Sequence, residues 1–359
     1  MRELVVISGK GGTGKTSLSA SFAVLAGNAV LADCDVDAAD LSLVLPPEIE
    51  RREEFRSGRT AVIRPADCVR CGACLEKCRF GAVVQTCETS VSSDAIFCQD
   101  CDFCERACSV RNNFLVHEMS AACGDPQATR FSIDPLACEG CGVCVHICPA
   151  GAIDFPECSC GEWFVSRTRC GPLVHARLAP AAENSGKLVS LVRAQARELA
   201  QATKREVLII DGAPGIGCPV IASLTGATAA LIVTEPTVSG RHDLERVAGV
   251  ARHFGVPAWV CVNKWDLNPA MTEQIEAAAR VCGIQIAGRV RYDQSVTAAQ
   301  IAGRTIVEFA ADGVASEVRA VWDAFGAAQW ISPSRPGTSA VSAAALIKGV
   351  ASNTDGSAS

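Results

Sequence analysis

The chain has 359 residues, 49% of them hydrophobic and 20% charged, which is enough apolar material for about two domains with buried cores. Its net charge of −6 argues against nucleic acid as an obligate partner, because such partners favour a basic face. No signal peptide and no run of about 18 apolar residues is predicted, so we expect a cytoplasmic protein without a membrane anchor. Its 21 cysteines are then expected to include metal ligands rather than disulfides.

The chain begins with a predicted nucleotide site. An apolar run at 4–7 predicts a buried strand, and a helix is predicted over 15–26. Between them, G-K-G-G-T-G-K-T fits the Walker A pattern, whose backbone N–H groups face phosphates at the positive end of a helix. Lys15 is predicted to reach the β- and γ-phosphates, and the Thr16 hydroxyl to bind Mg²⁺. The predicted loop residues are Gly9, Lys10, Gly11, Gly12, Thr13, Gly14, Lys15, Thr16 and Ser17.

An alternation of strands and helices surrounds a cysteine-rich block. A predicted strand at 29–32 is followed by D-C-D-V-D. The sequence from 46 to 170 is then rich in cysteines and in residues typical of turns. The alternation resumes with a helix near 186–202 and strands at 206–211, 230–234, 258–262 and 285–290. This pattern predicts an α/β fold with a doubly wound, mostly parallel sheet.

Two acidic residues follow predicted strands, where catalytic carboxylates of nucleotide hydrolases lie. Asp211 ends an apolar strand and is predicted to hold Mg²⁺ as a Walker B carboxylate. Asp35 is a candidate for orienting the attacking water, and an indirect role near Mg²⁺ or a capping role is the alternative.

Two segments within the cysteine-rich block repeat one motif. Residues 68–83 and 138–153 both read C-x-x-C-G-x-C-x-x-x-C-x-x-G-A-[VI], the spacing of bacterial ferredoxins, in which the fourth cysteine serves the other cluster. One predicted [4Fe–4S] ligand set is Cys68, Cys71, Cys74 and Cys148. The other predicted set is Cys78, Cys138, Cys141 and Cys144. Zinc is the alternative, although four-thiolate zinc sites usually show two separated C-x-x-C pairs.

A third run of cysteines has the same spacing but lacks the glycine and the G-A-[VI] ending. It is a candidate for a third cluster, with zinc or a redox disulfide as alternatives, and consists of Cys98, Cys101, Cys104 and Cys108. We expect an α+β, ferredoxin-like domain over 60–157, with an extra insertion at 86–130, inside an ATPase domain formed by 1–45 and 171–331. The tail at 332–359 is rich in Ser, Ala, Gly and Thr and is predicted to be disordered.

Several of these motifs resemble one class of ATPases. Lys10 within K-G-G-T-G-K-T is similar to the deviant Walker A of the MinD/ParA/Mrp/nitrogenase-iron-protein class. D-C-D-V-D at 33–37 and D-G-A-P-G-I-G at 211–217 resemble its two switches. With H-A-R-L at 175–178 and E-N-S-G-K-L at 183–188, residues 1–325 resemble MinD-superfamily ATPases with an inserted ferredoxin domain. The resemblance implies Mg-dependent ATP hydrolysis and a homodimer in which Lys10 reaches the partner's nucleotide.

Two further details leave alternatives open. V-N-K-W-D at 262–266 contains the N-K-x-D pattern of GTPases, but the class places an asparagine there against adenine, so ATP is favoured over GTP. The predicted contacts near the base are Asn263, Lys264, Arg291 and Asp293. Cys218 lies seven residues after Asp211, the offset of a cluster ligand in the nitrogenase iron protein. It is a candidate transfer thiol, and a buried small residue is the alternative.

Three functions share this expected core of Mg-ATP hydrolysis and [4Fe–4S] binding. The first is electron transfer coupled to ATP hydrolysis, with a redox protein as partner. The second is an assembly or carrier ATPase that delivers an iron–sulfur cluster or metallocofactor to an apo-acceptor. The third is a non-enzymatic, redox-sensing switch.

Overall fold

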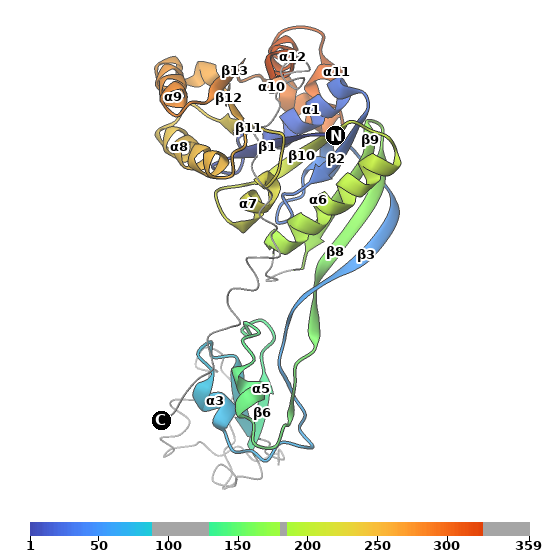
Figure 1. The fold of residues 1–359 in the computed structure, drawn as a ribbon, viewed down its shortest axis with the longest axis vertical. Helices are drawn as coiled ribbons and strands as arrows, with labels where there is room; N and C mark the ends of the chain where they lie inside the picture. Colours follow the sequence, from blue (N-terminus) through green and yellow to red (C-terminus); the bar gives the residue numbers. More distant parts are fainter. Residues whose placement is uncertain (88–128, 180–184, 326–359) are drawn as a thin grey trace, which may run out of the picture.

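The computed structural model describes residues 1–87, 129–179 and 185–325. Two lobes of unequal size are joined by a long two-stranded ribbon, which we call the neck (Figure 1). The neck consists of the antiparallel strands β3 (Glu48–Arg59) and β8 (Glu157–Thr168). The smaller lobe is therefore an insertion between two strands of the larger one.

The larger lobe is built on a nine-stranded sheet in the order β13-β12-β11-β1-β10-β2-β9-β8-β3. The strands from β13 to β9 pair in parallel, and β8 and β3 add an antiparallel edge. Residues such as Leu4 and Ile7 are fully buried, as expected for parallel strands covered on both faces. The bounds are β1 (Arg2–Ser8), β2 (Ala29–Asp33), β9 (Gly171–Leu178), β10 (Val207–Pro214), β11 (Ala229–Thr234), β12 (Ala258–Asn263) and β13 (Gln285–Val290).

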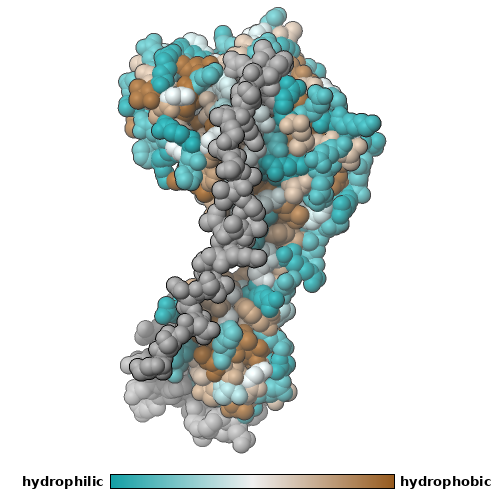
Figure 2. Space-filling view, in the orientation of Figure 1, coloured by the Kyte–Doolittle hydropathy of each residue, from teal (hydrophilic) through white to brown (hydrophobic). Residues whose placement is uncertain are grey.

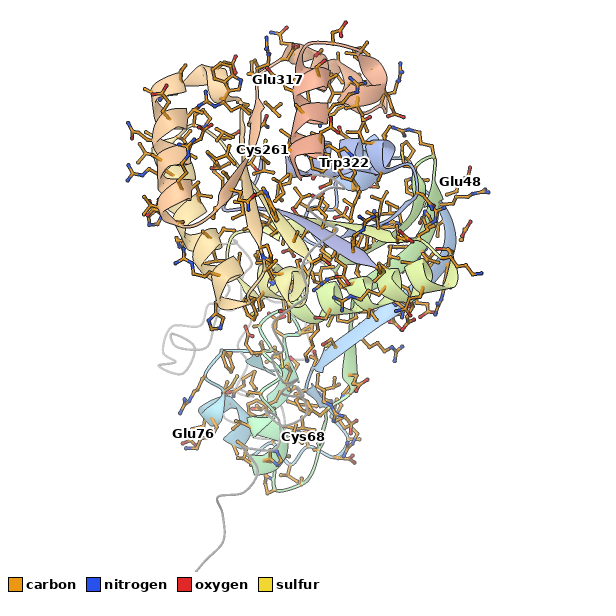
Figure 3. All side chains as sticks on the ribbon, turned by 45° about the horizontal axis from the view of Figure 1, so that its top comes forward. Glu48, Cys68, Glu76, Cys261, Glu317 and Trp322 are labelled. Atoms are coloured by element: carbon orange, nitrogen blue, oxygen red, sulfur yellow. The ribbon has the colours of Figure 1, made fainter. Side chains whose placement is uncertain are left out.

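Helices cover both faces of this sheet, so the predicted doubly wound fold is confirmed. One face packs against α6 (Ser185–Ala202), α7 (Cys218–Leu224), α8 (Val238–His253) and α9 (Pro269–Val281). The other packs against α1 (Lys15–Ala26), α2 (Leu41–Val44), α10 (Gln294–Ile301), α11 (Ile306–Phe309) and α12 (Val314–Phe325). On this second face, Phe22 of α1 lies against Trp322 of α12, with ring centroids 5.2 Å apart. Trp322 is labelled in Figure 3.

The smaller lobe consists of two similar halves. In the first, β4 (Val62–Ile63), α3 (Ala73–Lys77) and β5 (Val83–Cys87) follow one another, and in the second β6 (Thr129–Ile133), α5 (Val143–Ile147) and β7 (Ile153–Asp154) do. Strand β4 pairs with β7 and β5 with β6, both antiparallel, so the halves are interleaved. Corresponding glycines before the two helices, Gly72 and Gly142, have φ of 72° and 73°. The repeated sequence thus folds into a repeated structure.

The neck is the part of the fold that the sequence did not predict. Its strands at 48–59 and 157–168 belong to the large sheet, although they lie outside the ATPase ranges 1–45 and 171–331 that the sequence predicts. Charged residues dominate β3 and are largely exposed, so no alternation of apolar and polar residues marks it as a strand. Cross-strand contacts support it instead, as where Arg52 Nε donates to Glu162 Oε1 at 2.9 Å.

The surface of the protein has two notable properties. Within the described residues, no helix is both long and apolar enough to cross a membrane. Apolar side chains reach the surface of the smaller lobe (Figure 2). They include Val69, Leu75, Phe80, Leu136 and Val143.

Candidate nucleotide and cluster sites

The glycine-rich loop between β1 and α1 is held by the end of a neighbouring strand. The Asn263 amide at the end of β12 donates to the Thr13 carbonyl at 2.8 Å. Gly14 has φ of 92°, and a Cβ there would lie 2.4 Å from Asn263 Nδ2, so only glycine fits. A Cβ at Gly11 or Gly12 would meet nothing within 4 Å, since these residues face open space. The loop thus has the open concave backbone that phosphate binding requires.

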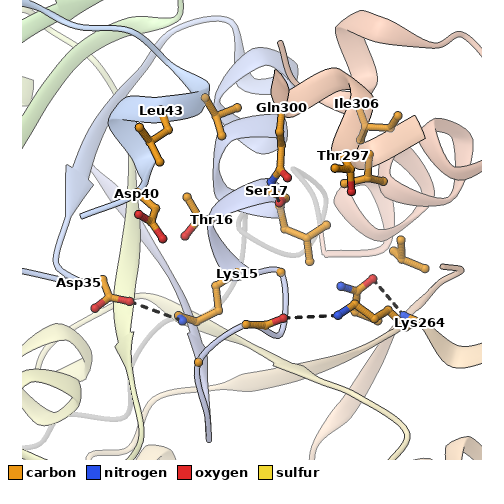
Figure 4. A pocket seen from close by; sticks show the side chains of 18 of the residues that line it. Lys15, Thr16, Ser17, Asp35, Asp40, Leu43, Lys264, Thr297, Gln300 and Ile306 are labelled. Carbon is orange, nitrogen blue, oxygen red and sulfur yellow. Dashed lines mark hydrogen bonds and ion pairs between the residues drawn. The ribbon is translucent and has the colours of Figure 1, made fainter. Parts of the chain in front are cut away.

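A cavity of about 790 Å³ opens above this loop, within the range of small-molecule sites (Figure 4). It brings together most of the residues predicted for the nucleotide. The predicted residues in its lining are Gly11, Gly12, Gly14, Lys15, Thr16, Ser17, Asp35, Asn263, Lys264, Arg291 and Asp293. Gly9 has a different role, because a Cβ there would lie 2.1 Å from Asp243 Cβ on α8. Gly9 therefore allows the loop to pack closely on that helix.

Near the glycine-rich loop, buried carboxyl groups outnumber the one buried lysine among the described residues. Lys15 Nζ lies 3.7 Å from Asp35 Oδ2, and both side chains are nearly buried (Figure 4). Asp211 accepts a hydrogen bond from Ser19 at 2.9 Å through Oδ1, while its buried Oδ2 has no hydrogen-bond partner among the described residues. Burial raises the pKa of Asp211. The Thr16 hydroxyl is near enough to this carboxyl group to lower its pKa, against the effect of burial. A buried carboxyl oxygen and a hydroxyl at this distance fit a Mg²⁺ site.

Asp35 makes a pH dependence testable. Burial raises its pKa to about 6, against the lowering effect of Lys15. If Asp35 orients the attacking water, only its ionised form acts, so activity is present above pH 6 and is lost below it. We expect kcat/KM for ATP to fall about tenfold per pH unit below about pH 6, since this ratio reports the free enzyme.

A pH profile of kcat/KM for wild type and Asp37→Asn checks this expectation. The Asp37 carboxylate is a neighbour that also raises the pKa of Asp35, so its removal should move the midpoint to lower pH. A profile that is flat between pH 5 and 7, or a midpoint unmoved by Asp37→Asn, would contradict the assignment.

Two cavities in the smaller lobe match the two predicted cysteine sets. One is lined by Cys68, Cys71, Cys74 and Cys148. The other is lined by Cys78, Cys138, Cys141 and Cys144. In each, three thiols come from one motif and the fourth from the other motif, as the ferredoxin pattern requires. No group of three or more His, Cys, Asp or Glu side chains in the described part of the chain is close enough to hold a single metal ion.

The thiols lie at the edge of a small apolar core. Cys74 is buried with Ile63, Phe131 and Ile153, whereas Cys71 is exposed. Burial raises the pKa of Cys74, and the neighbouring thiols add to this. Burial also acts on the pKa of Cys78, but backbone N–H groups of the loop that follows it outweigh burial and lower that pKa. Figure 3 places Cys68 in the smaller lobe and Glu76 at its surface.

Comparison with known proteins identifies the family of the chain. A family profile described as the CobQ/CobB/MinD/ParA nucleotide binding domain matches residues 4–306. The chain belongs to this family. It has the P-loop fold of that family with an inserted ferredoxin-like domain, as the sequence predicted.

Individual relatives cover different parts of the chain. An uncharacterized protein of Methanocaldococcus jannaschii is 31% identical over 272 residues, which are 74% of this chain and 79% of the relative. The polyferredoxin protein MvhB of Methanothermus fervidus is 36% identical over 95 residues, 26% of this chain and 21% of the polyferredoxin. Among solved structures, the cell division ATPase MinD of Pyrococcus furiosus is 16% identical, with a TM-score of 0.49, covering 90% of this chain and 98% of MinD.

Lys10 has a partner within its own chain that the sequence did not reveal. Its Nζ lies 3.1 Å from Glu235 Oε2, and Lys264 Nζ lies 2.5 Å from Glu235 Oε1. Burial acts on the pKa of Glu235, but hydrogen bonds from both lysines outweigh it and lower the pKa. Glu235 directly follows β11, and a single acid after a strand is too common a pattern to indicate this role. The family resemblance predicts that Lys10 acts on a partner's nucleotide, which requires it to leave Glu235.

The side chains at the far end of the cavity form hydrogen bonds within the protein. Arg291 Nε donates to Glu317 Oε1 at 2.7 Å. Asp293 accepts from Ser295 N at 2.8 Å and caps α10. Their contact with a base stays a prediction, and their observed contacts give them structural roles.

Of the remaining cysteines with a predicted role, the structure describes Cys218 alone. The run at Cys98, Cys101, Cys104 and Cys108 lies outside the described residues. Cys218 is the first residue of α7 and is exposed, so the alternative of a buried small residue is wrong. The sequence did not settle this exposure, because Cys218 lies seven residues after the buried Asp211, beyond a loop whose path the sequence does not give.

Proposed function

We propose that the protein couples Mg-ATP hydrolysis to electron transfer through two [4Fe–4S] clusters in its ferredoxin-like domain. The ATPase half rests on membership of the MinD/ParA family and on the charge pattern around the glycine-rich loop. The cluster half rests on the two four-thiol cavities and on the similarity to a polyferredoxin. The coupling rests on the neck.

The nucleotide site would act through positioning and charge. Lys15 would bind the β- and γ-phosphates, and Thr16 and Asp211 would hold Mg²⁺, which when bound neutralises charge on the phosphates. Asp35 would hold the attacking water in line with the γ-phosphate. Lys10 of a second copy would complete the site, so that hydrolysis requires a dimer.

The smaller lobe would carry the electrons. Bound clusters would supply reversible one-electron chemistry, and the eight thiols are the residues that would hold them. Cys71 and Cys141 are exposed, one in each ligand set. Apolar residues such as Val69 and Leu136 reach the surface beside the two motifs, where a redox partner protein would dock (Figure 2).

The single observation that carries the coupling is the continuity of β3 between the two sites. Val44 lines the nucleotide cavity, and β3 begins at Glu48, four residues later. The strand ends at Arg59, whose carbonyl would lie 2.3 Å from a Cβ on Gly140, between two ligands of one cluster. A nucleotide-dependent movement of α2 would therefore reach a cluster loop through one strand.

We infer that the nucleotide is ATP rather than GTP. The aspartate of N-K-x-D reads guanine in GTPases, but Asp266 Oδ1 here accepts the Tyr292 N–H at 2.7 Å. Asp266 is not part of the cavity lining in the described chain, although Asn263 and Lys264 are. The carboxylate that would select guanine is thus turned to the backbone.

A substitution checks this inference. Asp266→Ala should leave the ratio of kcat/KM for ATP over GTP within about threefold of wild type, because guanine discrimination by this carboxylate would otherwise change by roughly 10- to 100-fold. The measurement is steady-state hydrolysis of both nucleotides. Wild-type preference for GTP that Asp266→Ala abolishes would overturn the inference.

The coupling itself is tested by hydrolysis with clusters in defined redox states. Anaerobically purified protein is assayed fully reduced and fully oxidised, while the reduced clusters are followed by EPR with and without Mg-ATP. We expect the rate to differ between redox states, the EPR signal to shift on ATP binding, and iron to stay bound. Equal rates and an unchanged signal would refute coupling.

The same experiment distinguishes electron transfer from a second candidate function, that of a carrier ATPase. The exposure of Cys218 on α7 favours this second candidate. In that case iron and sulfide would pass to an apo-acceptor during turnover. Cys218→Ser would abolish that transfer and leave ATP binding intact. The coupled electron-transfer proposal instead expects Cys218→Ser to retain all of its iron and its redox-dependent rate.

A further inference from the structure

Two cysteines outside both ligand sets lie side by side in the neck. Cys158 and Cys160 are on β8, and their Sγ atoms are 3.7 Å apart. Cys158 is partly exposed, whereas Cys160 is 5% exposed. Both thiols donate to one acceptor, the Ser57 carbonyl of β3, at 3.2 Å and 2.6 Å. A dithiol thus bridges the two strands that connect the lobes.

An irregularity in the neck makes this arrangement feasible. The pairing of β3 with β8 shifts register between Phe55 and Arg56 and again between Arg56 and Arg59. Gly58 has φ of 75° in the same stretch. Alternate residues of a strand are separated by about 6.6 Å, near the upper limit of about 6.8 Å for the Cα atoms of a disulfide. A bulged strand can bend, which brings such a pair within range.

We propose that Cys158 and Cys160 form a reversible disulfide by exchange with a small-molecule disulfide. The Cys158 thiolate attacks one sulfur of that disulfide, and the other half leaves as a thiolate. Cys160 then displaces the bound half from Cys158. The two cysteines are oxidised by two electrons, the external disulfide is reduced to two thiols, and the two cysteine protons pass to these leaving groups.

The order of the two steps follows from exposure. Cys158 can meet an external molecule, whereas Cys160 is covered by β3 and the adjoining sheet. Burial also raises the pKa of Cys160, which lowers the share of the reactive thiolate at this position. A ring closed by alternate residues of a strand is strained, and strained disulfides are the readily reduced, regulatory kind.

The dithiol is connected to the nucleotide site through backbone hydrogen bonds. The Cys160 carbonyl accepts from Ala179 N at 2.9 Å, and the preceding Leu178 N donates to the Val36 carbonyl at 3.4 Å. Val36 directly follows Asp35. Oxidation removes both S–H donors from the Ser57 carbonyl, so it removes contacts between β3 and β8 at the point where β8 bonds to the segment beside the Asp35 loop. The proposal does not depend on the function proposed for the clusters.

The test is chemical and uses the full-length, anaerobically purified protein with its iron. The protein is equilibrated in a series of reduced and oxidised glutathione mixtures, quenched with acid, alkylated and digested for mass spectrometry. We expect the peptide with Cys158 and Cys160 to change from two alkyl groups to none, with loss of two hydrogens. This change should be reversible at constant iron content. Two alkyl groups throughout the series, or pairing only after iron has left, would overturn the proposal.

Three variants test the exchange order. Cys160→Ser should retain glutathione on Cys158, because nothing displaces it, at a level at least tenfold above that on Cys160 in Cys158→Ser. The matched control is Cys170→Ser, which alters a partly buried thiol at the turn between β8 and β9 and should cycle like wild type. Equal glutathione on the two single variants would contradict the proposed exchange.

Discussion

Two double substitutions are expected to lose different amounts of iron, although both remove two cysteine ligands. Cys74→Ala with Cys148→Ala should lose about four irons per chain, the content of one [4Fe–4S] cluster. Cys144→Ala with Cys148→Ala should lose about eight, the content of two. The reason is the pairing of thiols in the two cavities of the smaller lobe. Cys74 and Cys148 line the same cavity, whereas Cys144 lines the other.

The design isolates the crossed ligation because both variants share Cys148→Ala. If each motif held its own cluster, the outcomes would be reversed, since Cys144 and Cys148 belong to one motif. Only differences from wild type are compared, so a further cluster elsewhere in the chain would not affect the result. Iron and sulfide are measured after anaerobic purification, and the single variant Cys148→Ala should lose about four irons. Equal iron loss in the two double variants would show that the assignment is wrong.

The sequence predicted those features that are encoded by residues close together in the chain. The glycine-rich loop and the two cysteine motifs are contiguous patterns, and most of the loop residues and all eight cysteines line three cavities. The crossing of the fourth cysteines is also a property of a short repeat. The bounds predicted for the helix at 15–26 agree with the structure, because the glycine-rich loop precedes it and Gly27 ends it in the left-handed conformation.

What the sequence could not predict depended on distant pairing. Strand β3 consists largely of charges, and its partner Glu162 lies 110 residues from Arg52. Glu235 became informative only when the loop carrying Lys10 was seen beside it. Asp266 matched a guanine-reading motif in sequence, and only its hydrogen bond to the Tyr292 backbone revealed another role. Such contacts are set by tertiary packing, which spacing along a chain does not encode.

Lys10 is expected to act across a dimer, and this can be tested by complementation. Lys10→Ala should still bind ATP but hydrolyse it at least about 10³-fold more slowly, the scale of a lost cationic contact to the transferred phosphoryl group. Lys15→Ala should lose phosphate binding. Neither homodimer then has a working site. In a heterodimer of the two variants, however, the Lys10→Ala subunit binds ATP and its partner supplies Lys10.

That heterodimer should recover about half of the wild-type rate, because one of two symmetric sites is complete. It is isolated with a different affinity tag on each subunit, so that no homodimer contributes. In the isolated chain Lys10 is held 3.1 Å from Glu235, so forming the dimer must break this ion pair. Glu235→Gln, which weakens the pair without touching the glycine-rich loop, should therefore lower the protein concentration at which hydrolysis becomes half-maximal. If the heterodimer is as inactive as the two homodimers, Lys10 acts in the site of its own subunit. Hydrolysis would then not be expected to depend on protein concentration.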